Sequence, residues 1–222
     1  MGISHIRGSV NVVDSGTFYT INLSANPTTG DTVCVGVVFE TTVSGVSVED
    51  GNFNAYTVTP SSPSPFEDGY VYLFYLLSAP SNASRAISIS WTGAANSTGW
   101  ADEFRTSGGK ISFDTDAAAA SATGGTTVNT PSITPATTGG LLYATASSAM
   151  SVITAPASGA TLGGWTGAAG AISNGFMSEY ILAAAGTSQA VDFTQSVSSA
   201  WSAMAMSFTF TPRELSSLGC GF

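Results

Sequence analysis

Apolar and polar residues alternate with a period of two along much of this sequence. The alternation covers residues 19–23, 33–39, 87–91 and 204–210. Each run predicts a strand with one face turned to a core, because every second side chain of a strand lies on the same face. Turn residues separate the runs, and Asp50-Gly51 in particular predicts a type I′ hairpin turn. The pattern predicts an all-β chain, folded as an antiparallel, jelly-roll-like β-sandwich rather than a parallel sheet with crossover helices.

Three short blocks of sequence recur in the same order after about a hundred residues. The first set lies at residues 28–33, 69–77 and 84–89 and is followed by Trp100. The second lies at residues 137–142, 175–182 and 188–193 and is followed by Trp201. The features that recur are strand pattern, turn glycine and one aromatic residue, with no reactive group among them. We therefore expect two pseudo-repeated halves, in which Trp100 and Trp201 are equivalent core anchors.

The expected domain organisation is one sandwich between two terminal arms. We expect an N-terminal arm at residues 1–13, the sandwich at 14–210 and a C-terminal arm at 211–222. The half-repeats are expected at about 14–105 and 126–210, joined by a linker rich in Gly, Ser, Thr and Ala. One sandwich is favoured over two because the second half offers too few long strands to bury a core alone.

Composition limits the partners that this chain can have. Charged residues make up 9% of the sequence, whereas about 25% is usual for soluble domains. The net charge is −9 and the five basic residues are scattered along the sequence, so nucleic acid is not expected as a partner. The apolar runs are shorter than the roughly 20 residues that cross a bilayer, and the N-terminus does not resemble a secretory signal. We expect a soluble chain with a neutral polar surface that suits assembly into a larger particle.

The two cysteines are Cys34, inside a strand pattern, and Cys220, two residues from the end. A buried thiol and a loose terminal thiol are the favoured interpretation, and a disulfide between them is the alternative.

The stretch at residues 70–77 departs from alternation because both of its faces are apolar. Tyr70, Tyr72 and Phe74 fall on one face. One interpretation is a central strand that the protein covers on both sides. The other is that another subunit or a sugar covers this aromatic face, which makes the three residues candidates for an interface.

The sequence predicts no catalytic residue and no cofactor. His5 is the single histidine, so a hydrolytic triad has no base in the body of the chain, and no His or Cys cluster is present to hold zinc. Asp50 with Asn52, and Asp114 with Asp116, are the best positions for a calcium ion. Neither pair has the loop pattern of a calcium-binding hand, and solvated turn charges are the default interpretation.

Two aromatic residues are candidates for stacking on a sugar. Trp165 lies in a glycine-rich stretch, and Tyr56 follows the Asp50-Gly51 turn. Each either packs into the protein or is displayed for a ligand.

The sequence also resembles a known class of β-sandwich module. The matching features are the run Gly30-Asp31-Thr32-Val33-Cys34-Val35, the turn Asp50-Gly51-Asn52, the strand that ends in Tyr75-Leu76-Leu77, and Trp100 ahead of a last strand. Together they resemble modules of tailed-bacteriophage virion proteins and of bacterial surface proteins, over most of residues 25–210. The chain departs from that class in its very low lysine content and in the lack of an appended shaft.

This resemblance implies a structural or binding role without catalysis. Our first hypothesis is a virion protein, either a capsid decoration (cement) protein or a minor capsid protein. It would bind the shell protein, and copies of itself, through apolar strand surfaces and terminal arms. The alternative is a carbohydrate-binding or adhesin module of a phage fibre or a bacterial cell surface, with a host glycan as partner.

Overall fold

The computed structural model describes residues 2–66, 69–129, 132–137, 139–148, 153–156, 165–166, 175–183, 188 and 192–213. These residues form strands and turns, and no helix occurs among them. All strand pairs are antiparallel and lie in two sheets, so the expected antiparallel β-sandwich class is confirmed.

The first sheet contains every strand before residue 107, and the second sheet every described strand after it. The strands of the first sheet are β1 (Ile3–Asn22), β2 (Thr32–Phe39), β3 (Ser44–Asp50), β4 (Thr57–Val58), β5 (Ser64–Phe66), β6 (Gly69–Leu76) and β7 (Ala86–Thr106). Those of the second sheet are β8 (Gly109–Asn129), β9 (Gly140–Ser148), β10 (Ile153–Pro156), β11 (Trp165–Thr166), β12 (Gly175–Ala183) and β13 (Asp192–Pro212). A short turn at Ser107 and Gly108 joins the sheets.

Apart from β5, which pairs with β6 and has no counterpart among the described strands, the two sheets have the same connectivity. The first has the order β1-β7-β2-β6-β4 with β3 on β7, and the second pairs β8-β13-β9-β12-β11 with β10 on β13. The long pairs β1/β7 and β8/β13 both contain register shifts near the middle, where a strand bends. The turns that lead into β2 and β9 each contain a glycine with positive φ, Gly30 at 90° and Gly139 at 77°. The recurring sequence blocks therefore fall on corresponding strands.

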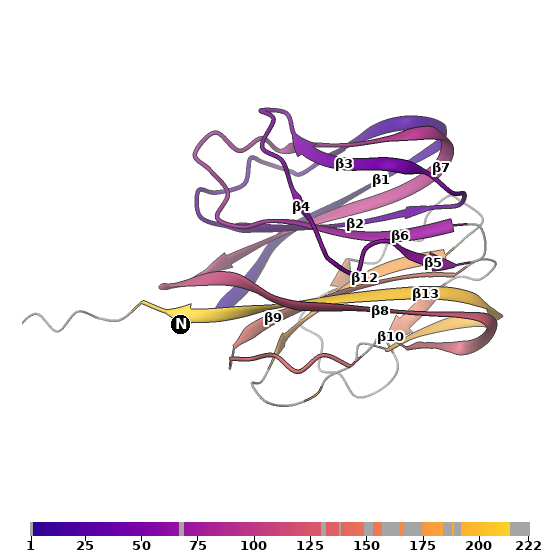
Figure 1. Ribbon diagram of the computed structural model, residues 1–222. Coiled ribbons are helices and arrows are strands. Elements are labelled where there is room, and N and C mark those ends of the chain that lie inside the picture. The colour runs from indigo at the N-terminus through magenta and orange to yellow at the C-terminus, as the bar shows by residue number, and fades with distance from the viewer. Residues whose placement is uncertain are drawn as a thin grey trace, which may run out of the picture.

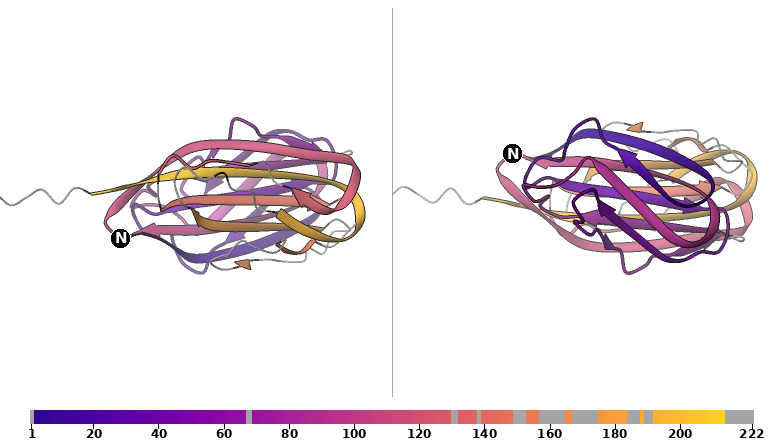
Figure 2. Two further views of the ribbon diagram at one scale, coloured as in Figure 1. Left: turned by 90° about the horizontal axis from the view of Figure 1, so that it is seen from below. Right: turned by 90° about the horizontal axis from the view of Figure 1, so that it is seen from above.

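The bend in β1 and β7 folds the first half into two layers, which Figure 1 shows as β3, β1 and β7 above β2 and β6. One hydrophobic core lies between these layers. It contains the alternate residues of one face of β2, namely Val33, Val35, Val37 and Phe39. The views from below and above in Figure 2 place the second half on one outer side of the molecule and the strands of the first half on the other.

A second core joins the two halves, and a third lies within the second half. The joining core takes Cys34, Leu73, Trp100 and Phe104 from the first half, and it takes Tyr143, Met204, Met206 and Phe208, among others, from the second. The third core packs Val128 of β8 and Phe193 of β13 with Leu142 and Ala144 of β9. The central strands β2 and β9 are consequently buried at every residue.

Two segments that are expected to lie outside the sandwich are parts of its strands instead. Residues 3–13, expected as an N-terminal arm, pair with β7 as the first part of β1. The expected Gly/Ser/Thr/Ala linker before residue 126 is most of β8, which pairs with β13. Backbone pairing does not need large side chains, which explains why the sequence pattern missed both segments. Of the expected C-terminal arm, Thr211 and Pro212 end β13, and residues 214–222 lie outside the described residues.

Trp100 and Trp201 are both buried, but they are not equivalent anchors. Trp100 pairs with Gly36 in the middle of β2, whereas Trp201 pairs with Ser148 at the end of β9. Trp100 belongs to the core between the halves and Trp201 to the core within the second half. Trp91, in the internal core of the first half, is the better counterpart of Trp201.

Cys34 is a free thiol with an exposed fraction of 0% in the joining core. Burial raises the pKa of this thiol well above its ordinary value, and the nearby Asp102 carboxylate adds to the effect. Because the thiolate is the reactive form, we expect iodoacetamide to leave Cys34 unmodified in the folded protein and to alkylate it fully in urea. Peptide mass spectrometry of the two samples measures this, and rapid alkylation of the folded sample would contradict the burial.

Candidate functional site

Charged side chains of the first half gather where β1, β2 and β7 meet. Asp31, Asp102 and Glu103 are buried, with exposed fractions of 4%, 1% and 0%. A buried carboxylate is costly unless charged or hydrogen-bonding groups surround it. The partners of these three groups therefore determine what this region can do.

Glu103 is held from two sides. The Arg7 Nε atom lies 2.7 Å from Glu103 Oε2, and the Thr28 amide donates a hydrogen bond to Glu103 Oε1 at 3.0 Å. Burial raises the pKa of Glu103, and Asp31 acts in the same direction, whereas the Thr28 amide and Arg7 act in the opposite direction. Glu103 thus links the strand β1 to the turn before β2.

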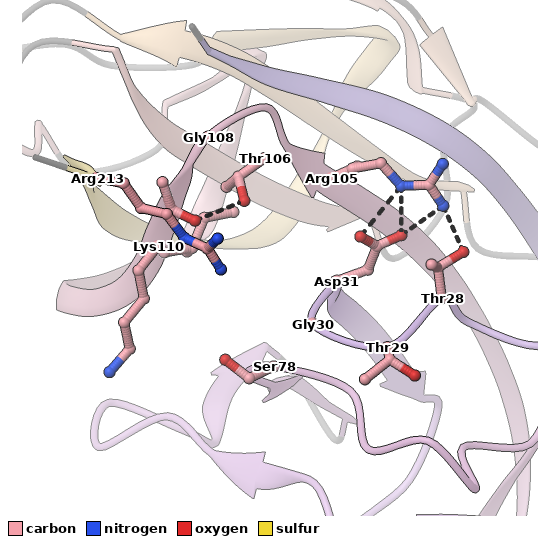
Figure 3. Close-up of a pocket in the computed structure, with 12 residues that line it drawn as sticks. Thr28, Thr29, Gly30, Asp31, Ser78, Arg105, Thr106, Gly108, Lys110 and Arg213 are labelled. Atoms are coloured by element: carbon pink, nitrogen blue, oxygen red, sulfur yellow. Dashed lines mark hydrogen bonds and ion pairs between the residues drawn. The ribbon is translucent and has the colours of Figure 1, made fainter. Parts of the chain in front are cut away.

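Arg105 forms a forked contact with Asp31 (Figure 3). Its Nε atom donates to the two carboxylate oxygens at 3.2 and 3.0 Å, and its Nη2 atom donates to Oδ2 at 2.8 Å. The same Nη2 donates to the Thr28 hydroxyl and lies 3.7 Å from Glu103 Oε1. Such two-pronged contacts between guanidinium and carboxylate fix both groups in place.

Asp102 contacts the opposite side of β7, as strand alternation predicts for a neighbour of Glu103. His5 Nε2 lies 2.9 Å from Asp102 Oδ1, and the Tyr143 hydroxyl donates to Asp102 Oδ2 at 2.9 Å. Tyr143 belongs to β9, so this buried carboxylate connects the two sheets. The His5 ring also packs edge-on against Phe104, with centroids 5.4 Å apart.

These carboxylates contact other protein groups and together form a structural network. Acid–base catalysis requires a group that faces the substrate and exchanges a proton with it. Both oxygens of Asp102 accept protein donors, and Asp31 and Glu103 are bound to arginine side chains. Their geometry supports strand pairing and sheet packing.

A cavity of about 550 Å³ lies beside this network, at the end of the sandwich where β7 turns into β8. The turn before β2 contributes Thr28 to Asp31, the loop after β6 contributes Ser78, and the β7–β8 turn with its flanking residues contributes Arg105 to Ile111, apart from Ser107. Arg213, immediately after β13, completes the lining. Figure 3 shows the Arg105–Asp31 pair on one side of this region, Lys110 and Arg213 on the other, and Ser78 and Thr29 below.

Sequence reasoning missed this cavity because Arg213 is far from the other two cations in the chain. Arg105 and Lys110 flank the Ser107-Gly108-Gly109 break, and Lys110 pairs in register with Thr211, two residues before Arg213. The glycine-containing break was a usable signal, because a turn there places Arg105 and Lys110 at the same end of the sandwich. The pairing of β8 with β13, which brings in Arg213, was hidden by the low-complexity sequence of β8.

The carboxylates among the calcium candidates serve as hydrogen-bond acceptors within the fold. The Asp50 carboxylate accepts the amides of Asn52, Asn54 and Ser84 at 2.9, 3.1 and 2.8 Å, together with the Asn54 side chain. Asn52 is exposed, and its side chain donates to the Asn82 carbonyl. These donors occupy the carboxylate that a cation would need.

Asp114 and Asp116 are not brought together on a common partner either. Asp114 accepts the Ala136 amide at 3.0 Å and the Ser207 hydroxyl at 3.1 Å, whereas Asp116 accepts the Ser61 amide of the first half at 2.7 Å. Across the described residues, no group of three or more His, Cys, Asp or Glu side chains could hold a metal ion.

The aromatic interface candidates pack inside the protein, which corrects that expectation. Tyr72 and Phe74 have exposed fractions of 8% and 2%, and Tyr70 is half-buried against the same internal core of the first half. Val71 and Leu73 on the other face of β6 belong to the core between the halves. The interpretation of this segment as a strand covered on both sides is the correct one. The bend of β1 and β7, which the sequence did not predict, supplies the covering layer.

Of the two stacking candidates, Tyr56 is buried in the internal core of the first half and is not displayed to a ligand. Trp165 lies in the short strand β11, and its side chain is outside the described residues. Among the described residues no helix is long and apolar enough to span a membrane.

Comparisons with known proteins gave no family. No family model matches the sequence, and no curated protein matches it. Among the solved structures, this chain aligns with the major capsid protein P2 from bacteriophage PM2. The alignment covers 96% of this chain and 99% of that chain, with 10% sequence identity and a TM-score of 0.27. An alignment this loose does not support an inference about fold or function.

Proposed function

We propose that this protein is a non-enzymatic structural protein of a virus particle, namely a capsid decoration (cement) or minor capsid protein. The observation that carries the proposal is the shared connectivity of the two halves. We infer that the halves are an internal repeat, in which β1 to β4, β6 and β7 correspond to β8 to β13. Packing and strand pairing recur, whereas the charged network is confined to the first half and its junction. A repeat that shares its scaffold without its polar groups suits a building block.

The edges of the sheets offer surfaces for assembly. β1 and β8, of 20 and 21 residues, each pair along one side among the described strands. Edge strands carry unpaired backbone groups that can pair with another chain. With residues 3–13 now part of β1, these edges replace the N-terminal arm as the proposed contacts with the shell protein or with a second copy.

The turn after β3 offers a second contact. Phe53 has an exposed fraction of 80% and a positive φ of 61°, an uncommon conformation for a bulky residue. The loop is a three-residue connection whose positive φ falls on Phe53, rather than the type I′ turn expected at Asp50-Gly51. The hydrogen bonds to the Asp50 carboxylate hold this turn, so the aromatic ring is presented by an ordered loop.

The proposed docking role of Phe53 is tested with purified particles that lack this chain. We expect the wild-type chain to sediment with the particles, and Phe53→Ser to weaken that binding by about tenfold or more, as for an exposed aromatic anchor. Val197→Ser, which removes another exposed apolar side chain (53% exposed), is the matched control. Equal binding of the wild type and Phe53→Ser would exclude Phe53 as a contact, and no sedimentation of the wild type would count against the virion role.

A further inference from the structure

The cavity beside the β7–β8 turn concentrates positive charge in an acidic protein. The chain has five basic residues and a net charge of −9, yet Arg105, Lys110 and Arg213 all line this one cavity. Among the described residues that line the cavity, Asp31 is the single carboxylate. Cations gathered in a cleft raise the local concentration of anions, even when the whole molecule is acidic.

The three cations have different tasks. Arg105 is committed to Asp31 through its forked contact, so it neutralises that carboxylate and removes its repulsion for an anion. In the part of the chain that the structure describes, the Lys110 ammonium and the Arg213 guanidinium have no ion-pair partner. Both side chains belong to exposed residues on the same side of the cavity (Figure 3). Within the described residues, these two groups are the lining cations that remain for a ligand.

The remaining lining is polar and small. Hydroxyl groups come from Thr28, Thr29, Ser78 and Thr106, and Gly30, Gly108 and Gly109 contribute no side chain that would fill the space. Hydroxyls and cations together suit an oxyanion that carries further hydroxyl groups. A volume of about 550 Å³ is in the range of small-molecule sites and larger than a single inorganic anion needs.

We propose that this cavity binds a small hydroxylated anion, with its carboxylate or phosphate group between Lys110 and Arg213. The Arg105–Asp31 pair forms a fixed wall, and the threonine and serine hydroxyls contact the body of the ligand. A phosphorylated sugar and a sugar acid present the same chemistry from two sources. This site is independent of the proposed particle role, since a chain that is absent from particles would still bind the anion.

The proposal is tested by titration calorimetry of the full chain with glucose 6-phosphate, glucuronate, inorganic phosphate and glucose. We expect saturable binding of at least one sugar anion, weaker binding of inorganic phosphate and no binding of glucose. Whichever sugar anion binds more tightly identifies the preferred group. No binding of either sugar anion at about 10 mM, a concentration well above the usual range of small-molecule affinities, would overturn the proposal.

Charge-neutral variants separate a built site from general attraction. Lys110→Gln and Arg213→Gln each remove one cation of the lining, and we expect each to weaken sugar-anion binding by at least tenfold. Arg85→Gln removes the same charge from an exposed residue that does not line the cavity, and it should leave the affinity within twofold. An equal loss in all three variants would show diffuse charge attraction and overturn the site.

Discussion

Replacing Phe104 with alanine is expected to lower the free energy of unfolding by about 3–5 kcal/mol, the range for truncating a buried aromatic residue. Phe104 has an exposed fraction of 0% in the core between the halves. Its ring lies edge-on to Tyr143 of the second half, with centroids 6.0 Å apart. The substitution leaves a cavity between the sheets that rigid strands on both sides cannot close. Urea unfolding followed by tryptophan fluorescence measures the loss.

The matched control for this substitution is Phe18→Ala. It makes the same chemical change at a residue of β1 that is 68% exposed, where we expect a change within about 0.5 kcal/mol. A loss below about 1 kcal/mol for Phe104→Ala would contradict a tightly packed core between the halves.

Replacing Asp50 with alanine is expected to cost about 3–5 kcal/mol, because it leaves several backbone and side-chain donors without their buried, charged acceptor. Asp50 is 1% exposed, and its carboxylate accepts donors from Asn52, Asn54 and Ser84. It thus ties the turn after β3 to the segment before β7. Asp50→Asn keeps one oxygen acceptor and should lose less. Urea unfolding at neutral pH compares the variants.

The effect of Asp50 is expected to depend on pH in a defined direction. Burial alone would raise the pKa of Asp50, but the hydrogen bonds from Asn54, Ser84 and Asn52 outweigh burial and hold the pKa below its ordinary value of 3.8. A lowered pKa in the folded state stabilises the fold above the pKa of the unfolded chain, and this contribution is lost as the pH falls through the folded-state pKa. The stability gap between wild type and Asp50→Ala should be constant above about pH 5 and shrink below about pH 4.

Glu49→Ala is the control for both measurements, because it removes the same charge from the exposed neighbouring residue. It should change stability by less than about 0.5 kcal/mol. A gap for Asp50→Ala that persists unchanged down to about pH 2 would contradict the role of the ionised carboxylate.

The sequence predicted those parts of the fold in which side-chain pattern determines structure. Alternation located β2, and the recurring blocks fell on the turns and strands β2, β6 and β7 and their counterparts in the second sheet. β8 was missed because its alanines and serines give no apolar face, although its backbone pairs with β13 over nearly its whole length. The first part of β1 was missed for a related reason, since polar residues such as Asn11 occupy an edge strand.

The candidate site was largely beyond the reach of sequence reasoning. The sequence of a strand with two apolar faces, such as β6, does not show whether the same chain or a partner covers the second face. In the structure the same chain covers this face, because the bend of β1 and β7 places Tyr19, Ile21 and Ile89 over the face that carries Tyr72. The approach of Arg213 to Lys110 depends likewise on strand pairing between residues about a hundred positions apart.

The proposed virion role is tested most directly by the copy number of this chain in purified particles. Quantitative mass spectrometry of particles encoded by the same genome, with the shell protein as the internal reference, gives that number. We predict a fixed ratio of this chain to the shell protein that approaches one to one and survives repeated density-gradient purification. Absence of the chain, or a ratio that falls with each round of purification, would contradict the account.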